Sequence, residues 1–227
     1  MKAVILCAGY GTRMRPLTYY VNKGMIPING KPILEHIIAK LVRQGFQDFV
    51  VAISHLGEQV ENYFGHGERY DINITYVHSD TPVGTAGEIY KLAKLLQSDE
   101  HFLVHYGDII TDLDAQGLVR KHVQSKAAAT IGLVTGVRIH TGVARLGEDD
   151  AVVEFEEKPV FPQPTHAAVN CFTTRNLPYF REGEDIATHV IPALMRAGEK
   201  VVGFVDSRAY WQDVGRLSDL EEASNLL

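Results

Sequence analysis

Cysteine is scarce in this 227-residue sequence, which contains only Cys7 and Cys171. Each lies within an apolar run, which is typical of small buried residues and not of a disulfide framework. No apolar stretch approaches the roughly 20 residues that a membrane-spanning helix needs. The apolar run after Met1 and Lys2 is too short for the core of a signal peptide. A soluble, cytoplasmic protein without a membrane partner is therefore expected.

Positive charge is also limited, since 22 lysines and arginines stand against 28 aspartates and glutamates, for a net charge of -6. This balance excludes a broad basic surface for nucleic acid. A polyanionic substrate would need positive charge gathered at one site. No linker, low-complexity tract or internal repeat interrupts the chain, so residues 1–227 are expected to form one domain.

Apolar periodicity in the first half predicts alternating strands and helices. The expected strands are 2–7, 49–53, 72–77 and 101–106, and the expected helices are 32–43, 57–64 and 85–96. Thr85 is the expected N-cap of the last of these helices. This alternation is typical of βαβ units and predicts an α/β fold with a mainly parallel sheet.

The second half departs from this alternation. A helix at 115–124 precedes strand-like segments at 128–134, 142–146 and 152–156, which indicate a more antiparallel region. A helix at 186–197 contains Pro192, so a kink or a later start is expected there, and a strand at 201–205 follows it. The segment from Ser218 to Glu221 has the pattern of a capping box, and the last helix is expected to begin there.

The strand at 2–7 leads directly into a glycine-rich loop, Gly9-Tyr10-Gly11-Thr12-Arg13. Glycines at this place let the backbone approach a phosphate, with free N–H groups pointing at the anion. Met14 stands where a dinucleotide fingerprint needs a third glycine, and the Gly-Lys-Ser/Thr of a Walker A loop is missing. Three cations accompany the loop in a chain that is acidic as a whole. They are Arg13, Arg15 and Lys23, and together they predict a polyphosphate site.

These residues resemble the signature of the sugar-1-phosphate nucleotidyltransferases, and further motifs of that family follow over most of the chain. In chain order, the matching segments are Gly9-Tyr10-Gly11-Thr12-Arg13-Met14-Arg15-Pro16-Leu17-Thr18, Lys23, Pro27-Ile28-Asn29-Gly30-Lys31-Pro32, Val83-Gly84-Thr85-Ala86-Gly87, Tyr106-Gly107-Asp108, Phe155-Glu156-Glu157-Lys158-Pro159, Asn170 and Tyr210-Trp211-Gln212-Asp213-Val214-Gly215. The resemblance implies a Rossmann-like α/β core. Its mainly parallel mixed sheet would be flanked by helices and carry an inserted antiparallel sugar-binding region.

The resemblance also implies an activity: a nucleoside monophosphate passes from an NTP to a sugar-1-phosphate, with Mg²⁺ as cofactor. Arg13 and Lys23 are the expected catalytic residues, and Asp108 and Asp213 are the expected metal ligands. Both aspartates follow apolar runs and are expected at the carboxyl ends of strands, where open α/β sheets bind ligands. The nucleotide is expected at Leu6, Ala8, Gly9, Gly11, Thr12, Arg13, Gly84 and Thr85. The sugar phosphate is expected at Gly107, Glu157, Lys158 and Asn170.

The sequence departs from the family at two places. Asn22 and Gly24 flank Lys23 where the family usually has Pro-Lys-Pro, so a more mobile or differently shaped loop is expected. Asn170 is followed by Cys171 and Phe172 where a glycine and a tyrosine are common in the family. The sequence therefore does not determine which sugar is contacted.

The segment from Gly84 to Gly87 is most similar to the guanylyltransferases that use mannose- or heptose-1-phosphate, so guanylyl transfer is favoured. Uridylyl, thymidylyl and cytidylyl transfer are alternatives of the same class. A non-catalytic regulatory subunit that binds a nucleotide sugar is an alternative of another class. A homo-oligomer is an open alternative to a monomer.

Overall fold

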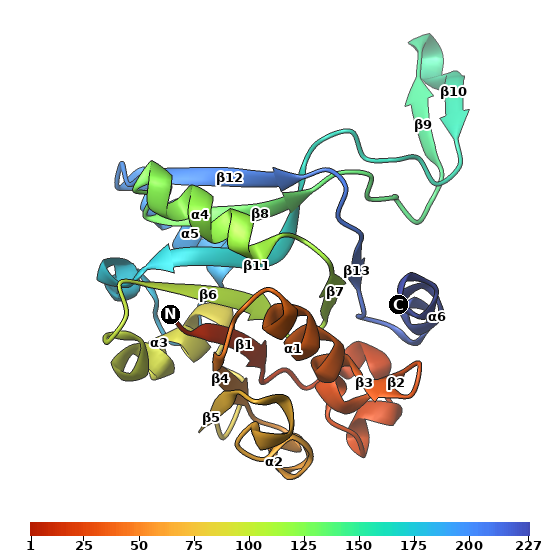
Figure 1. Ribbon diagram of the computed structural model, residues 1–227. Coiled ribbons are helices and arrows are strands. Elements are labelled where there is room, and N and C mark those ends of the chain that lie inside the picture. The colour runs from red at the N-terminus through yellow and green to blue at the C-terminus, as the bar shows by residue number, and fades with distance from the viewer.

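The computed structural model describes residues 1–227 and is built around one mixed seven-stranded sheet (Figure 1). The strands are β1 Ala3–Cys7, β4 Asp48–Ile53, β5 Asn73–His78, β6 His101–Tyr106, β8 Ala129–Val134, β11 Thr165–Thr173 and β12 Val201–Asp206. Their spatial order is β12-β8-β11-β6-β1-β4-β5. All neighbours are parallel except at β11, which runs antiparallel to both β6 and β8. The predicted α/β class with a mainly parallel sheet is thus confirmed.

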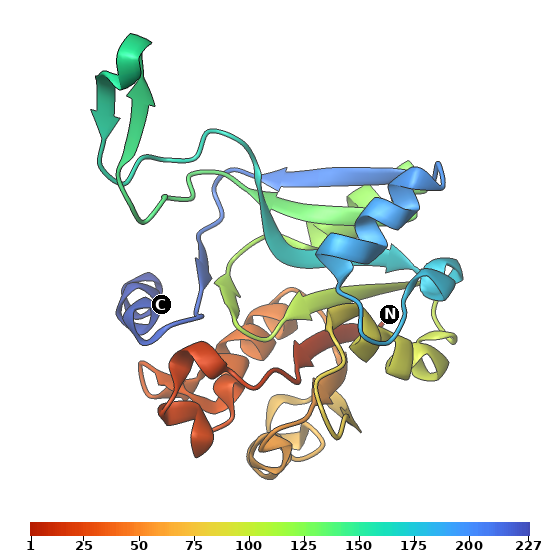
Figure 2. The same ribbon diagram turned by 180° about the vertical axis from the view of Figure 1, so that it is seen from behind.

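Helices cover both faces of this sheet, as the front and back views show (Figures 1 and 2). The helices are α1 Ile33–Arg43, α2 Gly57–Phe64, α3 Thr85–Leu96, α4 Ala115–Ser125, α5 Ile191–Arg196 and α6 Leu217–Leu226. One face carries α1 and α4, and the other carries α3 and α5. None of the helices combines the length and the apolar character needed to cross a membrane.

The alternation of side chains along each strand divides the core into two clusters. In β4, Phe49, Val51 and Ile53 pack with α1, α2 and α4, whereas Val50 and Ala52 pack with α3 and α5. All five are at most 2% exposed. A strand that is buried on both faces must be apolar at every position, which is why β4 is a continuous apolar run in the sequence.

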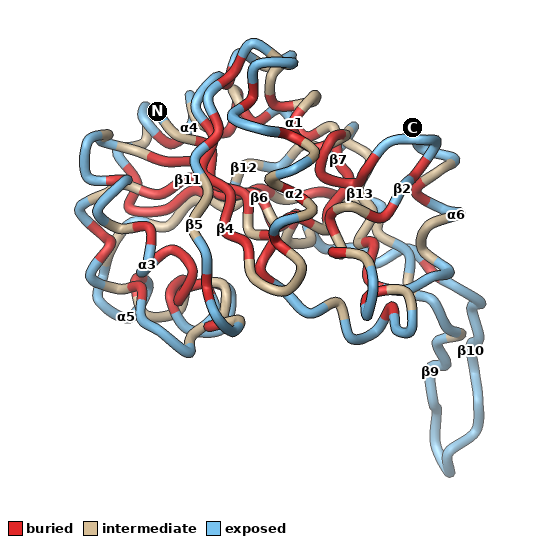
Figure 3. The backbone as a smooth tube through the Cα atoms, turned by 90° about the horizontal axis from the view of Figure 1, so that it is seen from below, coloured by how far each residue is buried: buried red, intermediate tan, exposed pale blue.

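Three two-stranded sheets lie outside the main sheet. They pair β2 Pro27–Ile28 with β3 Lys31–Pro32, β7 Ile109–Thr111 with β13 Trp211–Asp213, and β9 Val143–Leu146 with β10 Val152–Glu156. The β9–β10 pair accounts for two of the three segments of the predicted antiparallel region. The third, at 128–134, is instead β8 of the main sheet, which is antiparallel to β11 but parallel to β12. The β9–β10 pair forms an arm that projects from the body, and all residues of both strands are exposed (Figures 1 and 3).

The predicted helix at 186–197 is divided, as Pro192 indicates. A π-helical turn at Ile186–Val190 precedes α5, and Pro192 lies in the first turn of α5. Proline is tolerated there because its missing N–H would have no partner in the helix. The strand β11 was recognised in the sequence only as an apolar run around Cys171.

The predicted N-cap of α3 is wrong. Gly84 occupies the N-cap, and Thr85 is the first helical residue. The hydroxyl of Thr85 does not cap the helix because it donates to Asp185 Oδ1 at 3.1 Å. A partner about a hundred residues away therefore overrides the local preference of threonine.

The predicted start of α6 is also displaced. The helix begins at Leu217, and Arg216 is its N-cap. Asp219 Oδ2 reaches back to accept hydrogen bonds from the N–H groups of Arg216 (2.7 Å) and Gly215 (2.9 Å). Asp219 thus caps the N-terminus of α6, the role that the sequence pattern assigned to Ser218 and Glu221.

Candidate active site

A cavity of about 300 Å³ opens at the carboxyl ends of β1 and β6. Its walls include Lys23, Gly107 and Asp108. They also include the whole set that the sequence assigned to the nucleotide: Leu6, Ala8, Gly9, Gly11, Thr12, Arg13, Gly84 and Thr85. These segments meet because the carboxyl ends of neighbouring parallel strands lie at one edge of a sheet.

The glycine-rich loop turns sharply after β1. Gly11 has a left-handed φ of 60°, and a Cβ there would lie 2.8 Å from Thr18 Cγ2. Thr18 Oγ1 donates to the Gly11 carbonyl oxygen at 2.8 Å. The 3-10 turn Thr12–Met14 follows, and the fully buried Met14 anchors it in the core. Only glycine meets both the conformation and the space at position 11, so the loop keeps a fixed path beside the cavity.

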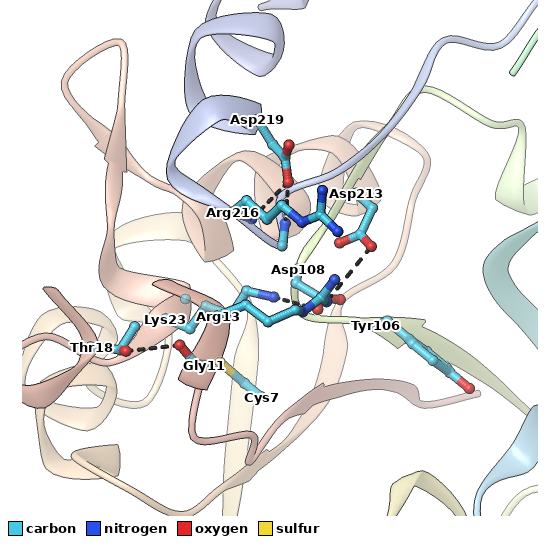
Figure 4. A network of polar contacts seen from close by, with 12 residues as sticks. Cys7, Gly11, Arg13, Thr18, Lys23, Tyr106, Asp108, Asp213, Arg216 and Asp219 are labelled. Atoms are coloured by element: carbon cyan, nitrogen blue, oxygen red, sulfur yellow. Dashed lines mark hydrogen bonds and ion pairs between the residues drawn. The ribbon is translucent and has the colours of Figure 1, made fainter. Parts of the chain in front are cut away.

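Two pairs of opposite charge lie at one end of the cavity (Figure 4). Lys23 Nζ lies 2.6 Å from Asp108 Oδ2, and Arg13 Nη2 lies 3.9 Å from Asp213 Oδ2. The Lys23 side chain is only 13% exposed, whereas that of Arg13 is 56% exposed. Solvent screens an exposed pair at this distance. Lys23 is therefore held firmly, and the Arg13 guanidinium is free to turn toward an anion.

The second aspartate reaches the site by an unexpected route. Asp213 does not end a strand of the main sheet; it is the last residue of β13 and pairs with Ile109 of β7. The N–H of Val214 donates to the carbonyl oxygen of Asp108 at 2.9 Å. This short antiparallel ladder brings the two carboxylates to one place (Figure 4), although about a hundred residues separate them in the sequence.

The donor set at this place fits a divalent cation. Asp213 Oδ1 is buried and has no hydrogen-bond partner. Burial, and then the charge of Asp108, raise the pKa of Asp213 above its ordinary value, although Lys23 and Arg13 act in the other direction. Two carboxylates that destabilise each other's charge, one of them with an unsatisfied oxygen, form a ligand set for a hard cation such as Mg²⁺. No cluster of three or more histidine, cysteine or acidic side chains occurs, so the remaining ligands would come from substrate oxygens or water.

Gly215 gives Arg13 its place beside this cluster. A Cβ at Gly215 would lie 2.7 Å from a guanidinium nitrogen of Arg13. Cys7 also lines the cavity, but burial raises the pKa of its thiol to about 12. The thiol is therefore neutral near pH 7, and nucleophilic thiolate chemistry is excluded at this residue.

The opposite end of the cavity is formed where the first turn of α3 meets Asp185. The N–H and the hydroxyl of Thr85 both donate to Asp185 Oδ1, at 3.0 and 3.1 Å. Asp185 Oδ2 makes no hydrogen bond or ion pair within the protein. Gly84 permits this approach, because a Cβ there would lie 2.3 Å from the carbonyl oxygen of Glu184.

Sequence reasoning did not assign several residues of the cavity wall to the site. They are Cys7, Gly24, Pro82, Glu88, Tyr106, Asp185 and Gly215. Tyr106 and Gly215 lie within motifs that the sequence analysis identified, so their positions in these motifs could have predicted that they line the site. Asp185 has no such signal, because its partner Thr85 is 100 positions away.

Comparison with known proteins agrees with this geometry. The model of the nucleotidyl transferase family matches residues 2–227. The chain belongs to the nucleotidyl transferase family. A mannose-1-phosphate guanylyltransferase of Mycobacterium tuberculosis is 33% identical over 98% of the chain. A UTP–glucose-1-phosphate uridylyltransferase of Synechocystis is 31% identical, also over 98% of the chain.

The chain spans less than two thirds of the length of these relatives, 63% of the first and 62% of the second. Among solved structures, that of HddC from Yersinia pseudotuberculosis superposes with a TM-score of 0.79 at 21% identity, over 99% of this chain and 98% of the other. This likeness supports the fold. Relatives named for different nucleotides and sugars thus match the same chain.

The structure does not bring every predicted residue into the cavity wall. Glu157 and Lys158 lie at the base of the arm, and both are exposed. Asn170 is fully buried in β11, where its Oδ1 bonds to His166 Nε2 at 3.0 Å. Asp213 stands next to the cavity without lining it.

Proposed function

We propose that the protein transfers a nucleoside monophosphate from an NTP to a sugar-1-phosphate and releases pyrophosphate. The observation that carries this proposal is the convergence of the glycine-rich loop, two cations and two carboxylates at one cavity. The cations are Arg13 and Lys23, and the carboxylates are Asp108 and Asp213. A dehydrogenase site would not need this charge distribution, whereas phosphoryl chemistry consists largely of positioning and charge neutralisation.

The residues of the chain would divide the work as follows. Backbone N–H groups of the loop at Gly9 and Gly11 would cradle the triphosphate. Arg13 would neutralise charge that develops on the leaving pyrophosphate, and Lys23 would neutralise charge at the reacting phosphorus. The nucleophile is the phosphate oxygen of the sugar phosphate, which is already ionised near pH 7, so no catalytic base is required. In-line attack then depends on how the two substrates are oriented.

Mg²⁺ is the cofactor that fits Asp108 and Asp213. The cation, when bound, would screen the negative charge of the phosphate oxygens between the two carboxylates. Lys23 Nζ lies 2.6 Å from Asp108 Oδ2 and holds this carboxylate at the cavity wall.

The sugar phosphate would bind on the side of the cavity that faces the arm. Lys158 is the proposed anchor of its phosphate, and Glu157 and Gly107 would contact the sugar. Asn170 reaches this subsite only if its fully buried side chain changes partners, since its Oδ1 is engaged by His166. Its Nδ2, which has no partner in the structure, is the atom that would gain a contact.

Guanine is the base that we propose for the nucleotide, with mannose- or heptose-1-phosphate as the sugar phosphate. The segment Gly84-Thr85-Ala86-Gly87 supports this choice, and Asp185 adds a chemical reason. A carboxylate only accepts hydrogen bonds, so Asp185 Oδ2 matches the N1–H and N2–H₂ donors of guanine. Uracil and thymine present carbonyl oxygens on both sides of one N–H, and these oxygens would repel the carboxylate. Cytidylyl transfer remains an alternative because cytosine also carries an amino group.

Pyrophosphate release tests the proposal. GTP, UTP, dTTP, CTP and ATP would each be combined with a panel of sugar-1-phosphates in the presence of Mg²⁺. We expect GTP to give the largest kcat/KM, and Asp185→Asn to reduce the preference for GTP over UTP. No release with any pair would reject the enzymatic function and favour a regulatory nucleotide-sugar-binding protein. Release with UTP or dTTP alone would keep the reaction and reject guanine.

A further inference from the structure

Asn22 is the residue before Lys23, and it is 1% exposed. Its backbone N–H donates to Gln59 Oε1 at 2.8 Å, and its Nδ2 donates to the carbonyl oxygen of His55 at 2.8 Å. Its Oδ1 accepts from the N–H of Gly24 at 2.9 Å. A buried amide whose groups are all satisfied in this way admits one geometry, since any other would leave a polar atom unpaired.

The same two partners also hold the chain before Asn22. His55 Nε2 bonds to the carbonyl oxygen of Thr18 at 3.0 Å, and Gln59 Nε2 donates to the carbonyl oxygen of Tyr20 at 2.8 Å. Four hydrogen bonds thus join residues 18–22 to the corner between β4 and α2. We refer to Asn22, His55 and Gln59 as the lysine clamp.

The corner that carries the clamp is strained. Leu56, between His55 and the start of α2, has a φ of 55°. The left-handed conformation costs a residue such as leucine about 1–2 kcal/mol. Such strain persists only where the surrounding contacts over-determine the backbone, and it is concentrated at functional sites.

Close packing holds the other side of Lys23. A Cβ at Gly24 would lie 2.6 Å from Cys7 Sγ, at the end of β1. The 3-10 turn Lys23–Met25 therefore lies directly against the strand that leads into the glycine-rich loop. Fixed from both sides, Lys23 extends its ammonium group to Asp108 at 2.6 Å.

We propose that Asn22, acting with His55 and Gln59, is a positioning residue for the catalytic Lys23. Asn22 has a φ of -56°, close to the value that a proline ring imposes. Hydrogen bonds of the clamp thus hold the backbone at a position where a proline ring would restrict it covalently. A proline at position 22 would keep φ but would lose both donors and the acceptor. The inference rests on the proposed nucleotidyl transfer, in which Lys23 acts at the reacting phosphorus.

A double-mutant cycle tests the coupling between Asn22 and Lys23. Asn22→Ala, Lys23→Ala and the double variant would be compared with the wild type by pyrophosphate release. We expect Asn22→Ala to lower kcat by roughly 10- to 100-fold, with a smaller change in the KM for the NTP, because displacement of a positioned group acts on the reacting state. In the Lys23→Ala background, the same change should alter kcat by less than about twofold. An equal loss in both backgrounds would overturn the inference.

Gln59 provides a second variant that does not depend on a buried position, since its side chain is only partly buried. We expect Gln59→Ala to lower kcat by several-fold. In the Lys23→Ala background, Gln59→Ala should alter kcat by less than about twofold. An equal loss of kcat in both backgrounds would overturn the role of this hydrogen bond, also if Asn22→Ala proves insoluble.

Gln44 is the matched control, because it joins two segments by the same chemistry. Its Nε2 donates to the carbonyl oxygen of Leu113 at 3.1 Å, and its Oε1 accepts from the N–H of Ala115 at 2.7 Å. None of these three residues lines the active-site cavity. Gln44→Ala should lower the melting temperature and leave kcat unchanged. A loss of kcat equal to that of Gln59→Ala would overturn the inference, whereas a wild type without turnover would reject the proposed function itself.

Discussion

The two ends of the proposed active site are built in opposite ways. At the nucleotide end, hydrogen bonds to neighbouring segments hold the glycine-rich loop, the 3-10 turn Lys23–Met25 (the lysine turn) and the first turn of α3. At the sugar end, Glu157 and Lys158 lie at the base of an arm whose strands bury no residue. The nucleotide end is therefore preorganised, as phosphate chemistry requires. The proposed sugar end lies on a segment that few contacts restrain.

The arm is nevertheless a regular structure. Ala144 pairs with Phe155 and Leu146 pairs with Val152 along the β9–β10 ladder. Phe155 is 66% exposed and Val152 is 62% exposed. A two-stranded ribbon is marginally stable in water. The arm can therefore change in sequence without disturbing the body of the protein, and the chain has family relatives that are named for different sugars.

The largest expected effect is at the nucleotide end. Asp108→Asn should lower kcat by about 10³-fold or more, because one carboxylate of the proposed Mg²⁺ site is lost. The melting temperature should change little, since the amide has nearly the same shape. Steady-state pyrophosphate release checks this expectation.

Asp99 is the matched control for Asp108. It also pairs with a lysine at 2.6 Å, Lys2, but it lies outside the cavity wall. Asp99→Asn should keep full turnover. Near-normal rates for Asp108→Asn, or an equal loss for Asp99→Asn, would remove the metal role.

The contrast also appears in stability. Phe102 is fully buried and contacts Phe172 and Phe180, at centroid distances of 5.7 and 6.1 Å. Phe102→Ala should lower the free energy of unfolding by about 3–5 kcal/mol, through lost burial and a cavity. Phe155→Ala should change it by less than about 0.5 kcal/mol, because the arm side chain is exposed. Urea unfolding followed by circular dichroism compares the two; similar losses would show that the arm packs on something in solution.

Substitutions at the sugar end should change mainly the KM for the sugar phosphate. Lys158→Ala should raise the KM for the sugar phosphate by roughly 10- to 100-fold, the worth of one charge-assisted hydrogen bond. The KM for the NTP should stay the same. Arg145→Ala on the same arm removes only the exposed pair with Glu154 and serves as the control. An unchanged KM in Lys158→Ala would exclude this residue from the sugar-phosphate subsite.

The smallest expected effect is a pH dependence of stability that belongs to the body and not to the arm. His122 is fully buried between the hydroxyls of Thr130 and Thr173, and burial lowers its pKa to about 4. In the unfolded chain the imidazole of this residue takes up a proton near pH 6.5, whereas in the folded chain it does so only near pH 4. The free energy of unfolding is therefore unaffected by this group above pH 6.5. It falls by about 1–3 kcal/mol as the pH is lowered from 6.5 to 4.

Urea unfolding at pH 7.5 and at pH 5 measures this loss. His122→Gln should reduce the difference in unfolding free energy between the two pH values. His140→Gln, at an exposed position near the arm, should leave it unchanged. An unaltered pH dependence in His122→Gln would show that other groups are responsible, the buried His105 among them, whose pKa burial also lowers to about 4.

Most of the elements of the fold could be predicted because their signals are local. The helix at Thr85–Leu96 and the strand at His101–Tyr106 follow directly from periodicity and length. The misplaced caps at Thr85 and Ser218 have different causes. Asp185, 100 residues away, accepts the hydrogen bond of the Thr85 hydroxyl. Asp219 forms a local capping box with Arg216, so the local pattern is present but begins two residues earlier than predicted.

The sequence by itself determined the family, the glycine-rich loop and the cations beside it, because these are contiguous in the chain. Only the tertiary structure decided how Asp213 reaches Asp108, since the pairing of β7 with β13 joins segments about a hundred residues apart. It also decided that Asn22 is an anchor, because hydrogen bonds to His55 and Gln59 depend on where β4 ends against the lysine turn. Contacts of this kind are set by packing across the sheet edge, and no local pattern in the chain records them.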